Sequence, residues 1–278
     1  MIRENRRFQT IAFQGGLDLE STPLKLGSGA LILCQNYEVK AGGGYTRVGG
    51  YERFDGQASP SAAEDIEAAR ALIQTVPGSG KILGAHWFAG SVYAFRNIAD
   101  GTAAKMYKSS ASGWEEVTTP VLQPDGKYEF INHNFYGATS LQRMYGVDGV
   151  NKAFMFDGTT FTQLIPPGTT TEPRHIAAHS NHLFLSYDQG QYLHSGIGEP
   201  TAWDVATEGA GAGGTGDDIV GMRTTVGGAL AFFMRNKVSM LYGSSKADWT
   251  SNDLRKQQDQ AGAIEHSIQD LGDMFYLD

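Results

Sequence analysis

Four histidines lie close together at positions 175, 179, 182 and 194. The steps of four and three residues among the first three would place them on one face of a helix, where imidazoles can bind a metal such as zinc. The neighbouring letters "HLFLSYD", residues 182–188, favour a strand instead. We therefore interpret His175, His179 and His182 as structural or surface residues, with zinc binding as the alternative that a calorimetric titration would test.

Two other stretches resemble phosphate-binding loops. The run "GAGGTG", Gly211–Gly216, satisfies G-x-G-x-x-G, but the segment before it lacks a buried strand and a strand rather than a helix follows. We predict a mobile loop between two sheets there. The stretch "PGSGKI", Pro77–Ile82, lacks the first glycine and the Ser/Thr of a P-loop and is predicted to be a linker.

The sequence contains no complete catalytic or metal-binding signature. Asp204, Asp217 and Asp218 could offer oxygens to calcium, but the order of acids typical of a calcium loop is missing, so solvated turn residues are predicted. G-x-S-x-G and H-E-x-x-H are also absent. We predict no catalytic, cofactor-binding or metal-binding residues, no cofactor and no enzyme activity. A glycosidase carboxylate pair scattered along the sequence stays open.

Composition narrows the class of protein. The chain has 278 residues, 41% of them hydrophobic, which is enough for a large core. Its formal net charge of -8 disfavours tight binding to nucleic-acid phosphates. A single cysteine, Cys34, cannot form an internal disulfide. Polar residues and glycines interrupt any secretion signal in residues 1–16, and no run of 18 apolar residues suggests a membrane span.

A repeated unit sets the predicted fold. Five stretches share a strand, a short turn and a second strand, and the residue that ends the first strand recurs after 47, 46, 45 and 42 residues. These marker residues are His86, His133, His179, Thr224 and His266. Their recurrence suggests, as a weaker hypothesis, a ring of imidazoles lining one face or a central channel.

Each repeat continues with two further strands. The fourth strand is predicted to begin at an aromatic residue, and these are Trp114, Phe161, Trp203 and Trp249. The chain has 36 glycines, including those of five Asp-Gly pairs, which favours hairpin turns. Four short antiparallel strands in each repeat of 42 to 47 residues predict an all-β fold, an array of β-propeller blades with aromatics packed between them.

Three segments are predicted. Residues 1–56 form an N-terminal arm with a β-hairpin around "KAGGG", and residues 57–80 form an insertion with one short helix over 61–74 and a linker. Residues 81–278 form about four blades and part of a fifth. A closed ring would therefore need strands from the N-terminal arm, from a longer native chain or from a neighbouring subunit.

The N-terminal arm resembles the opening of tailed-bacteriophage virion proteins of the tail-nozzle and packaged-DNA-stabilising kind. The positions that carry the likeness are Gly16, Leu17, Pro23, Asn36, Gly42 to Gly44, Arg47, Gly50 and Tyr51, with Ser195, Pro200 and Trp203 later in the chain. These motifs include no catalytic signature. Members of that group are often longer than this chain.

The resemblance implies a structural virion protein that is assembled in the host cytoplasm and forms a homo-oligomeric ring in the tail or neck. Its expected partners are copies of itself, other neck, tail or fibre proteins, and genomic DNA that passes without specific binding, which the acidic charge permits. The alternative is a carbohydrate-binding or glycan-cleaving propeller that uses Trp87, Trp114 and Trp203 as stacking platforms. A weaker alternative is a scaffold propeller that binds peptides.

Overall fold

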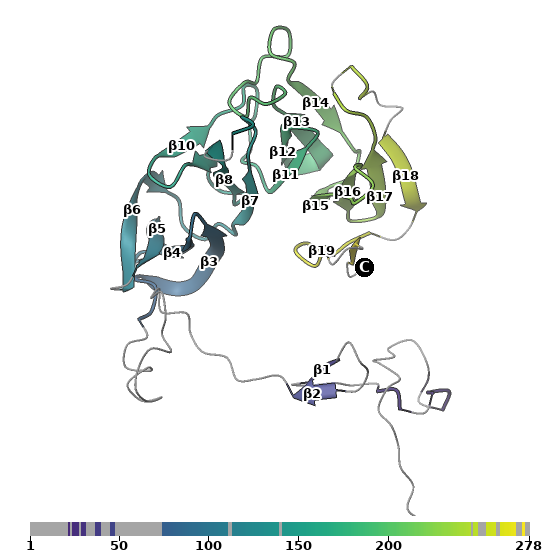
Figure 1. Ribbon diagram of the computed structural model, residues 1–278, viewed down its shortest axis with the longest axis horizontal. Coiled ribbons are helices and arrows are strands. Elements are labelled where there is room, and N and C mark those ends of the chain that lie inside the picture. The colour runs from purple at the N-terminus through teal and green to yellow at the C-terminus, as the bar shows by residue number, and fades with distance from the viewer. Residues whose placement is uncertain are drawn as a thin grey trace, which may run out of the picture. The chain divides into compact units, whose positions relative to one another are not determined.

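A computed structural model gives the fold, and its chain divides into two compact units, residues 1–53 and 54–278 (Figure 1). The residues described are 22, 24–27, 29–31, 37–39, 45–47, 74–110, 113–138, 141–245, 247–249, 254–259, 262–270 and 274–275. In the first unit, β1 (Tyr37–Val39) pairs antiparallel with β2 (Tyr45–Arg47), which confirms the predicted hairpin. The helix predicted over 61–74 lies, apart from its last residue, outside the described residues.

The second unit contains four sheets, each made of four consecutive antiparallel strands, which we call blades 1 to 4. Their strands are β3 (Ser79–Phe88), β4 (Ser91–Asn97), β5 (Ala104–Ser110), β6 (Gly113–Leu122); β7 (Glu129–His133), β8 (Arg143–Val147), β9 (Ala153–Phe156), β10 (Phe161–Leu164); β11 (His175–His179), β12 (His182–Ser186), β13 (Gln191–His194), β14 (Gly211–Gly214); and β15 (Ile219–Thr224), β16 (Leu230–Met234), β17 (Lys237–Leu241), β18 (Leu254–Asp259). The fold is therefore all-β and propeller-like, as predicted.

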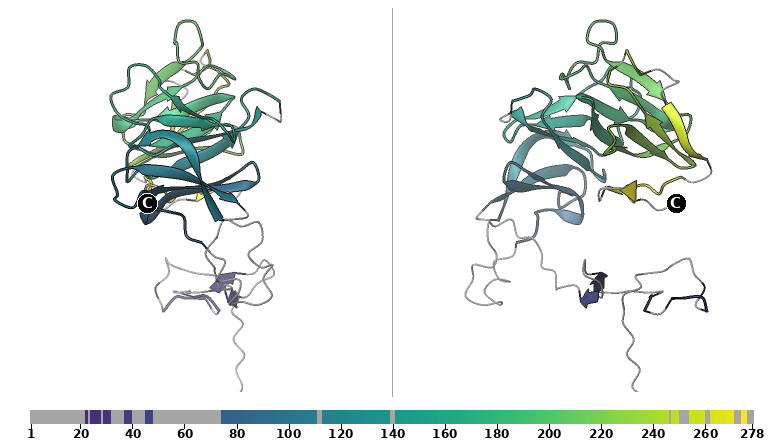
Figure 2. Two further views of the ribbon diagram at one scale, coloured as in Figure 1. Left: turned by 90° about the vertical axis from the view of Figure 1, so that its left-hand side faces the viewer. Right: turned by 45° about the vertical axis from the view of Figure 1, so that its right-hand side comes forward.

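The blades follow one another along an arc, with the first strand of each on the inner side and the fourth on the outer side (Figures 1 and 2). The inner strands β3, β7, β11 and β15 end at Phe88, His133, His179 and Thr224, which are 45, 46 and 45 residues apart. The predicted period is confirmed for these four strands, although the first of them ends at Phe88 and not at His86.

Aromatic side chains fill the space between blades 1 and 2. Phe95 and Phe154 are almost completely buried, and their ring centroids lie 5.6 Å apart. Each blade alternates side chains between two faces, and burying both faces requires a neighbour on each side.

Among the described residues, no helix is long and apolar enough to cross a membrane.

Blade 3 departs from the predicted pattern at its outer strand. The glycines predicted to form a mobile loop build β14, which pairs with β13. A Cβ atom on Gly211 would lie 2.4 Å from Nε2 of His194, and one on Gly213 would lie 2.4 Å from the Tyr192 ring. Glycine is needed here because side chains of β13 lie across the outer strand, which is a packing reason and not a turn signal.

Three further predictions about strand positions need correction. Trp114 and Phe161 lie at the start of outer strands, but Trp203 and Trp249 lie in the loops before β14 and β18. Strand β3 begins at Ser79, inside the stretch predicted as a linker.

A short hairpin follows blade 4. It pairs β19 (Gln269–Asp270) with β20 (Met274–Phe275), while the segment 262–268 before it is not a strand. His266, predicted to end a strand, therefore lies in a turn, with φ at 64°. Ala263 and Ile268 from this segment pack against the outward face of blade 4 and cover it.

Candidate functional site

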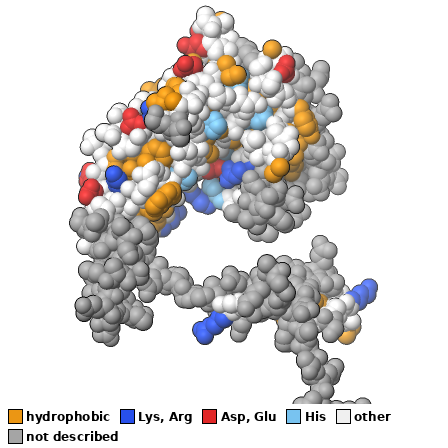
Figure 3. Space-filling model, in the orientation of Figure 1, with side chains coloured by type: hydrophobic (Ala, Val, Ile, Leu, Met, Phe, Trp, Pro, Cys, Tyr) orange, Lys and Arg blue, Asp and Glu red, His pale blue; other side chains and the backbone are white. Residues whose placement is uncertain are grey.

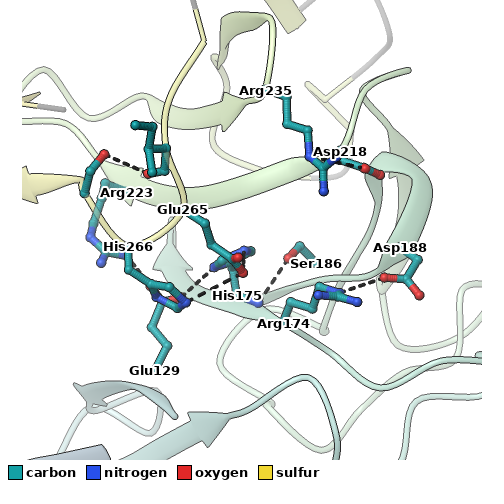
Figure 4. Close-up of polar contacts among 12 residues, drawn as sticks. Glu129, Arg174, His175, Ser186, Asp188, Asp218, Arg223, Arg235, Glu265 and His266 are labelled. Carbon is teal, nitrogen blue, oxygen red and sulfur yellow. Dashed lines mark hydrogen bonds and ion pairs between the residues drawn. The ribbon is translucent and has the colours of Figure 1, made fainter. Parts of the chain in front are cut away.

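Ionisable side chains gather at the inner side of the array (Figure 3). Glu129 and His175 are the first residues of the inner strands β7 and β11, and Arg223 lies on the inner strand β15. Glu265 and His266 reach the same place from the turn after blade 4 (Figure 4). We call these five residues the inner-rim network. They come from four segments, and the repeat brings together the three that are inner strands.

Glu129 is the centre of the network. His175 Nδ1 lies 2.8 Å from Glu129 Oε2, and Arg223 Nη1 donates to Glu129 Oε1 at 2.5 Å. The side chains of His175 and Glu129 are only 2% and 11% exposed. One carboxylate thus ties the inner strands of blades 2, 3 and 4 together.

The charge state of Glu129 follows from this geometry. Burial raises the pKa of Glu129, but the hydrogen bond and charge of His175, together with the charge of Arg223, outweigh burial and leave the pKa below its usual value. Glu129 is therefore ionised at neutral pH. A buried carboxylate with two cationic or donor partners is a stable arrangement only while both partners stay in place.

The turn after blade 4 faces the other side of His175. Glu265 Oε1 lies 3.6 Å from His175 Nε2 and 3.6 Å from His266 Nε2. Among the described residues, His175 Nε2 has no hydrogen-bond partner within normal distance. Burial and the nearby Lys127 ammonium lower the pKa of His266. The inner side of the array is therefore occupied by paired side chains near β7, β11 and β15.

A hollow of about 270 Å³ adjoins the network. It is lined by Asp125, Lys127, Asp148, Gly149, Val150, Arg174, Glu265 and His266. These residues come from the turns before β7 and β11, from the β8–β9 turn and from the turn after blade 4. A smaller hollow of about 80 Å³ shares Arg174 and Glu265. The lining of both hollows is mostly charged and polar.

Three of the opening histidines lie elsewhere, between blades 3 and 4. Ring centroids of His179, His182 and His194 lie 5.7, 4.7 and 5.0 Å from that of Trp249. We call these four residues the aromatic box. Burial lowers the pKa of His179 to about 4 and also lowers that of His182. His182 Nδ1 donates to the Ser195 carbonyl oxygen at 2.6 Å, so its Nε2 carries the lone pair.

The histidines do not form the ring of imidazoles suggested by their period. His86 stacks on Phe130 with ring centroids 5.1 Å apart, and His133 packs on Phe135 at 4.3 Å. His179 lies in the aromatic box, and only His266 lines the hollow. Among the described residues, no group of three His, Cys, Asp or Glu side chains has the geometry to hold a metal ion.

The tryptophans also take different roles. Trp203 is 8% exposed and packs in the core between blades 2 and 3. Trp114 is half-buried, and its Nε1 donates to the Gln74 carbonyl oxygen at 3.3 Å. Trp87 alone among the three predicted stacking platforms is widely exposed, at 59%. They therefore do not build one shared stacking surface.

Glu129, Arg223 and Glu265 were not predicted from the sequence. Glu129 and His175 are 46 residues apart and begin consecutive inner strands, so the period itself places them side by side. The same period therefore applies to the first residues of the inner strands as to their last residues. Glu265 carries no such signal because its turn is outside the four regular blades.

Comparisons with known proteins support no assignment to a family. No protein-family model matches the chain, and no curated protein matches it significantly. Among solved structures, a virginiamycin B lyase from Staphylococcus aureus is similar at 12% identity and a TM-score of 0.45, covering 67% of this chain and 59% of the lyase. A computationally designed protein is similar at 10% identity and a TM-score of 0.42, covering 62% of this chain and 96% of the design.

A third similar structure is PorZ, a bacterial surface component of the type-IX secretion system of Porphyromonas gingivalis. It has 10% identity and a TM-score of 0.34, covering 72% of this chain and 37% of PorZ. The chain thus spans little more than half of the lyase and about a third of PorZ. Likenesses this weak carry no argument about activity.

Proposed function

We propose that the protein is a structural subunit of a tailed-bacteriophage virion that forms a homo-oligomeric ring in the tail or neck. The proposal rests on one observation, that polar side chains at the inner rim pair with one another across blades. Glu129 contacts both His175 and Arg223. These contacts join three blades, so we interpret the three side chains as structural.

The residues that resemble the virion proteins also have structural roles where they are described. Ser195 is fully buried, and its hydroxyl accepts a hydrogen bond from the Leu183 amide at 3.0 Å. Trp203 packs between blades 2 and 3. Packing roles of this kind are compatible with a protein whose role is mechanical.

The proposal includes a position for the DNA. Because Glu129, His175 and Arg223 pair with one another at the inner rim, the passage would run between several copies of the subunit around a common axis and not along the axis of one array. The formal net charge of -8 would keep DNA from adhering to such a passage. Other neck, tail or fibre proteins would contact the ring.

Native mass spectrometry and negative-stain electron microscopy of the purified full chain test this proposal. We expect rings of one fixed copy number, and we expect the chain among the proteins of purified tails. Monomers at every concentration, together with absence of the chain from purified virions, would refute it.

A carbohydrate-binding or glycan-cleaving propeller is the second candidate. The exposed Trp87 indole and the polar hollow favour this candidate. The burial of Trp203 counts against it, because Trp203 was predicted from the sequence to be one of three exposed stacking platforms. Binding of the monomeric chain to a glycan array through Trp87, abolished by Trp87→Ala, would favour this candidate over the virion ring.

A further inference from the structure

The hollow beside the inner-rim network has a size that suits one small ring-shaped ligand. Its volume of about 270 Å³ lies just below the roughly 300 to 1,000 Å³ of pockets that hold drug-sized molecules. Its walls come from four separate segments of blades 2 and 3 and the turn after blade 4. Backbone hydrogen bonds join three of these segments, since the Lys127 amide donates to the Asp148 carbonyl oxygen at 3.2 Å and the Gly149 amide donates to the Pro173 carbonyl oxygen at 2.8 Å.

Some of the charged groups around the hollow are already bound to other residues. The Asp148 carboxylate accepts hydrogen bonds from the Val150 amide at 3.0 Å and from the amide and side chain of Asn151 at 2.6 Å each. Asp125 Oδ1 accepts a hydrogen bond from Asn97 Nδ2 at 2.8 Å. These two carboxylates shape the turns.

Other groups remain available to a ligand. Arg174 uses Nε for Asp188, at 2.7 Å, which leaves its Nη groups. No ion pair within the described part of the chain occupies the Lys127 ammonium, which is exposed. The Glu265 side chain is 46% exposed and offers carboxylate oxygen to the same hollow. Besides the His266 imidazole, the groups that can reach a ligand are thus two cationic donors and one carboxylate, which also lies 3.6 Å from His175 Nε2 and from His266 Nε2.

This mixture of cationic and anionic side chains favours one class of ligand over others. A simple anion would meet Lys127 and Arg174 but also the carboxylates of Asp125, Asp148 and Glu265, which repel it. An apolar ligand would find only Val150 as a large hydrophobic side chain. A hydroxyl group can donate to a carboxylate and accept from an ammonium or guanidinium at the same time, so neighbouring hydroxyls satisfy both kinds of group.

We propose that this hollow binds one hexose-sized ring of a carbohydrate through hydroxyl groups held between Lys127, Arg174 and Glu265. Val150, which is 41% exposed, offers an apolar contact to the carbon-bound hydrogens of the ring. The site is separate from the tryptophans and does not depend on the ring-forming role, so a virion subunit could use it to contact a glycan.

Isothermal calorimetry and saturation-transfer NMR on the full chain test the site with glucose, galactose, mannose and glucuronate. We expect saturable binding of at least one of them. Lys127→Ala and Glu265→Gln should each weaken that binding about tenfold, which corresponds to about 1.4 kcal/mol. The matched control is Lys105→Ala, because Lys105 pairs with Glu116 at 2.7 Å on blade 1, outside the hollow.

The absence of saturable binding by all four sugars overturns the proposal. Equal binding of acetate or phosphate overturns it too, because the hollow would then be an anion site. If Lys127→Ala and Lys105→Ala have the same effect, the sugar binds elsewhere. Thermal unfolding of each variant distinguishes loss of the site from loss of the fold. Ring formation is measured separately, so failure of either proposal leaves the other standing.

Discussion

Strand β11 carries histidines at both ends, and the two ends differ in their surroundings. His175 at the first end bonds to the Glu129 carboxylate, which also binds Arg223. His179 at the other end faces the Trp249 indole, and burial lowers its pKa to about 4. Both side chains are buried to a similar degree. The neighbours supplied by other blades, and not burial alone, decide whether a buried histidine is held by a charged partner.

The inner-rim network and the aromatic box hold the blades together in different ways. The inner-rim network joins blades through charge and hydrogen bonds, which need every partner present. The aromatic box joins blades 3 and 4 through neutral rings, which pack well but cannot accommodate a positive charge cheaply. We therefore expect the first region to be sensitive to mutation and the second to be sensitive to acid.

The largest expected effect is that of removing the centre of the network. Glu129→Ala should lower the free energy of unfolding by about 3 to 5 kcal/mol, because His175 and Arg223 lose their shared counter-charge in a buried place. Urea denaturation at pH 7 measures it. Glu116→Ala is the control, since the Lys105–Glu116 pair is about half exposed and solvent screening should leave it with a much smaller contribution. Equal losses in both variants would contradict the structural role of the network.

Acidification should affect the aromatic box next. The pKa of His179 is lower in the folded protein than in the unfolded chain, so the unfolded state binds protons more readily and stability falls as pH drops below about 6.5. Between pH 7 and pH 5 we expect a loss of about 1 to 2 kcal/mol from His179. His182 acts in the same direction, and so do His86, His133 and His266 outside the box, because burial lowers their pKa values as well. Glu129 adds to this only below about pH 4.5, because its pKa is lowered. Urea midpoints that do not change from pH 7 to pH 5 would contradict this.

A substitution can separate packing from protonation in the box. His179→Phe keeps a ring of similar size, so at pH 7.5 the free energy of unfolding should change by less than about 1.5 kcal/mol. The loss of unfolding free energy between pH 7 and pH 5 should become smaller by the amount that His179 contributes in the parent protein. Denaturation of the variant and the parent at both pH values gives the comparison. An unchanged pH dependence would place the titrating groups outside the box.

The smallest expected effect is spectroscopic. Protonation of the His179 imidazole in contact with the Trp249 indole should reduce the fluorescence of the indole below about pH 5, because the pKa of His179 is about 4 in the folded protein. Trp249→Phe should remove this change, while Trp87→Phe should keep it, because Trp87 is exposed and lies on blade 1. A pH response that survives in Trp249→Phe would contradict a titrating box around that side chain.

Local pairing explains why the blades could be predicted. Each strand pairs with its neighbour in sequence, so hydrophobic alternation and turns within about 46 residues already define a blade. Prediction failed for Gly211–Gly214 because a glycine run is the usual mark of a loop, whereas here small size lets the His194 and Tyr192 rings lie over the strand. That requirement becomes visible only when the partner strand is in place.

The sequence by itself determined the repeat, the all-β class and the order of strands within each blade, since these depend on residues close together in the chain. Only the tertiary structure decided which side chains meet between blades. Glu129 and Arg223 are 94 residues apart, and His179 meets Trp249 only after blades 3 and 4 are packed side by side. Such contacts depend on how successive sheets are placed around the arc, and no pattern within a single repeat contains that information.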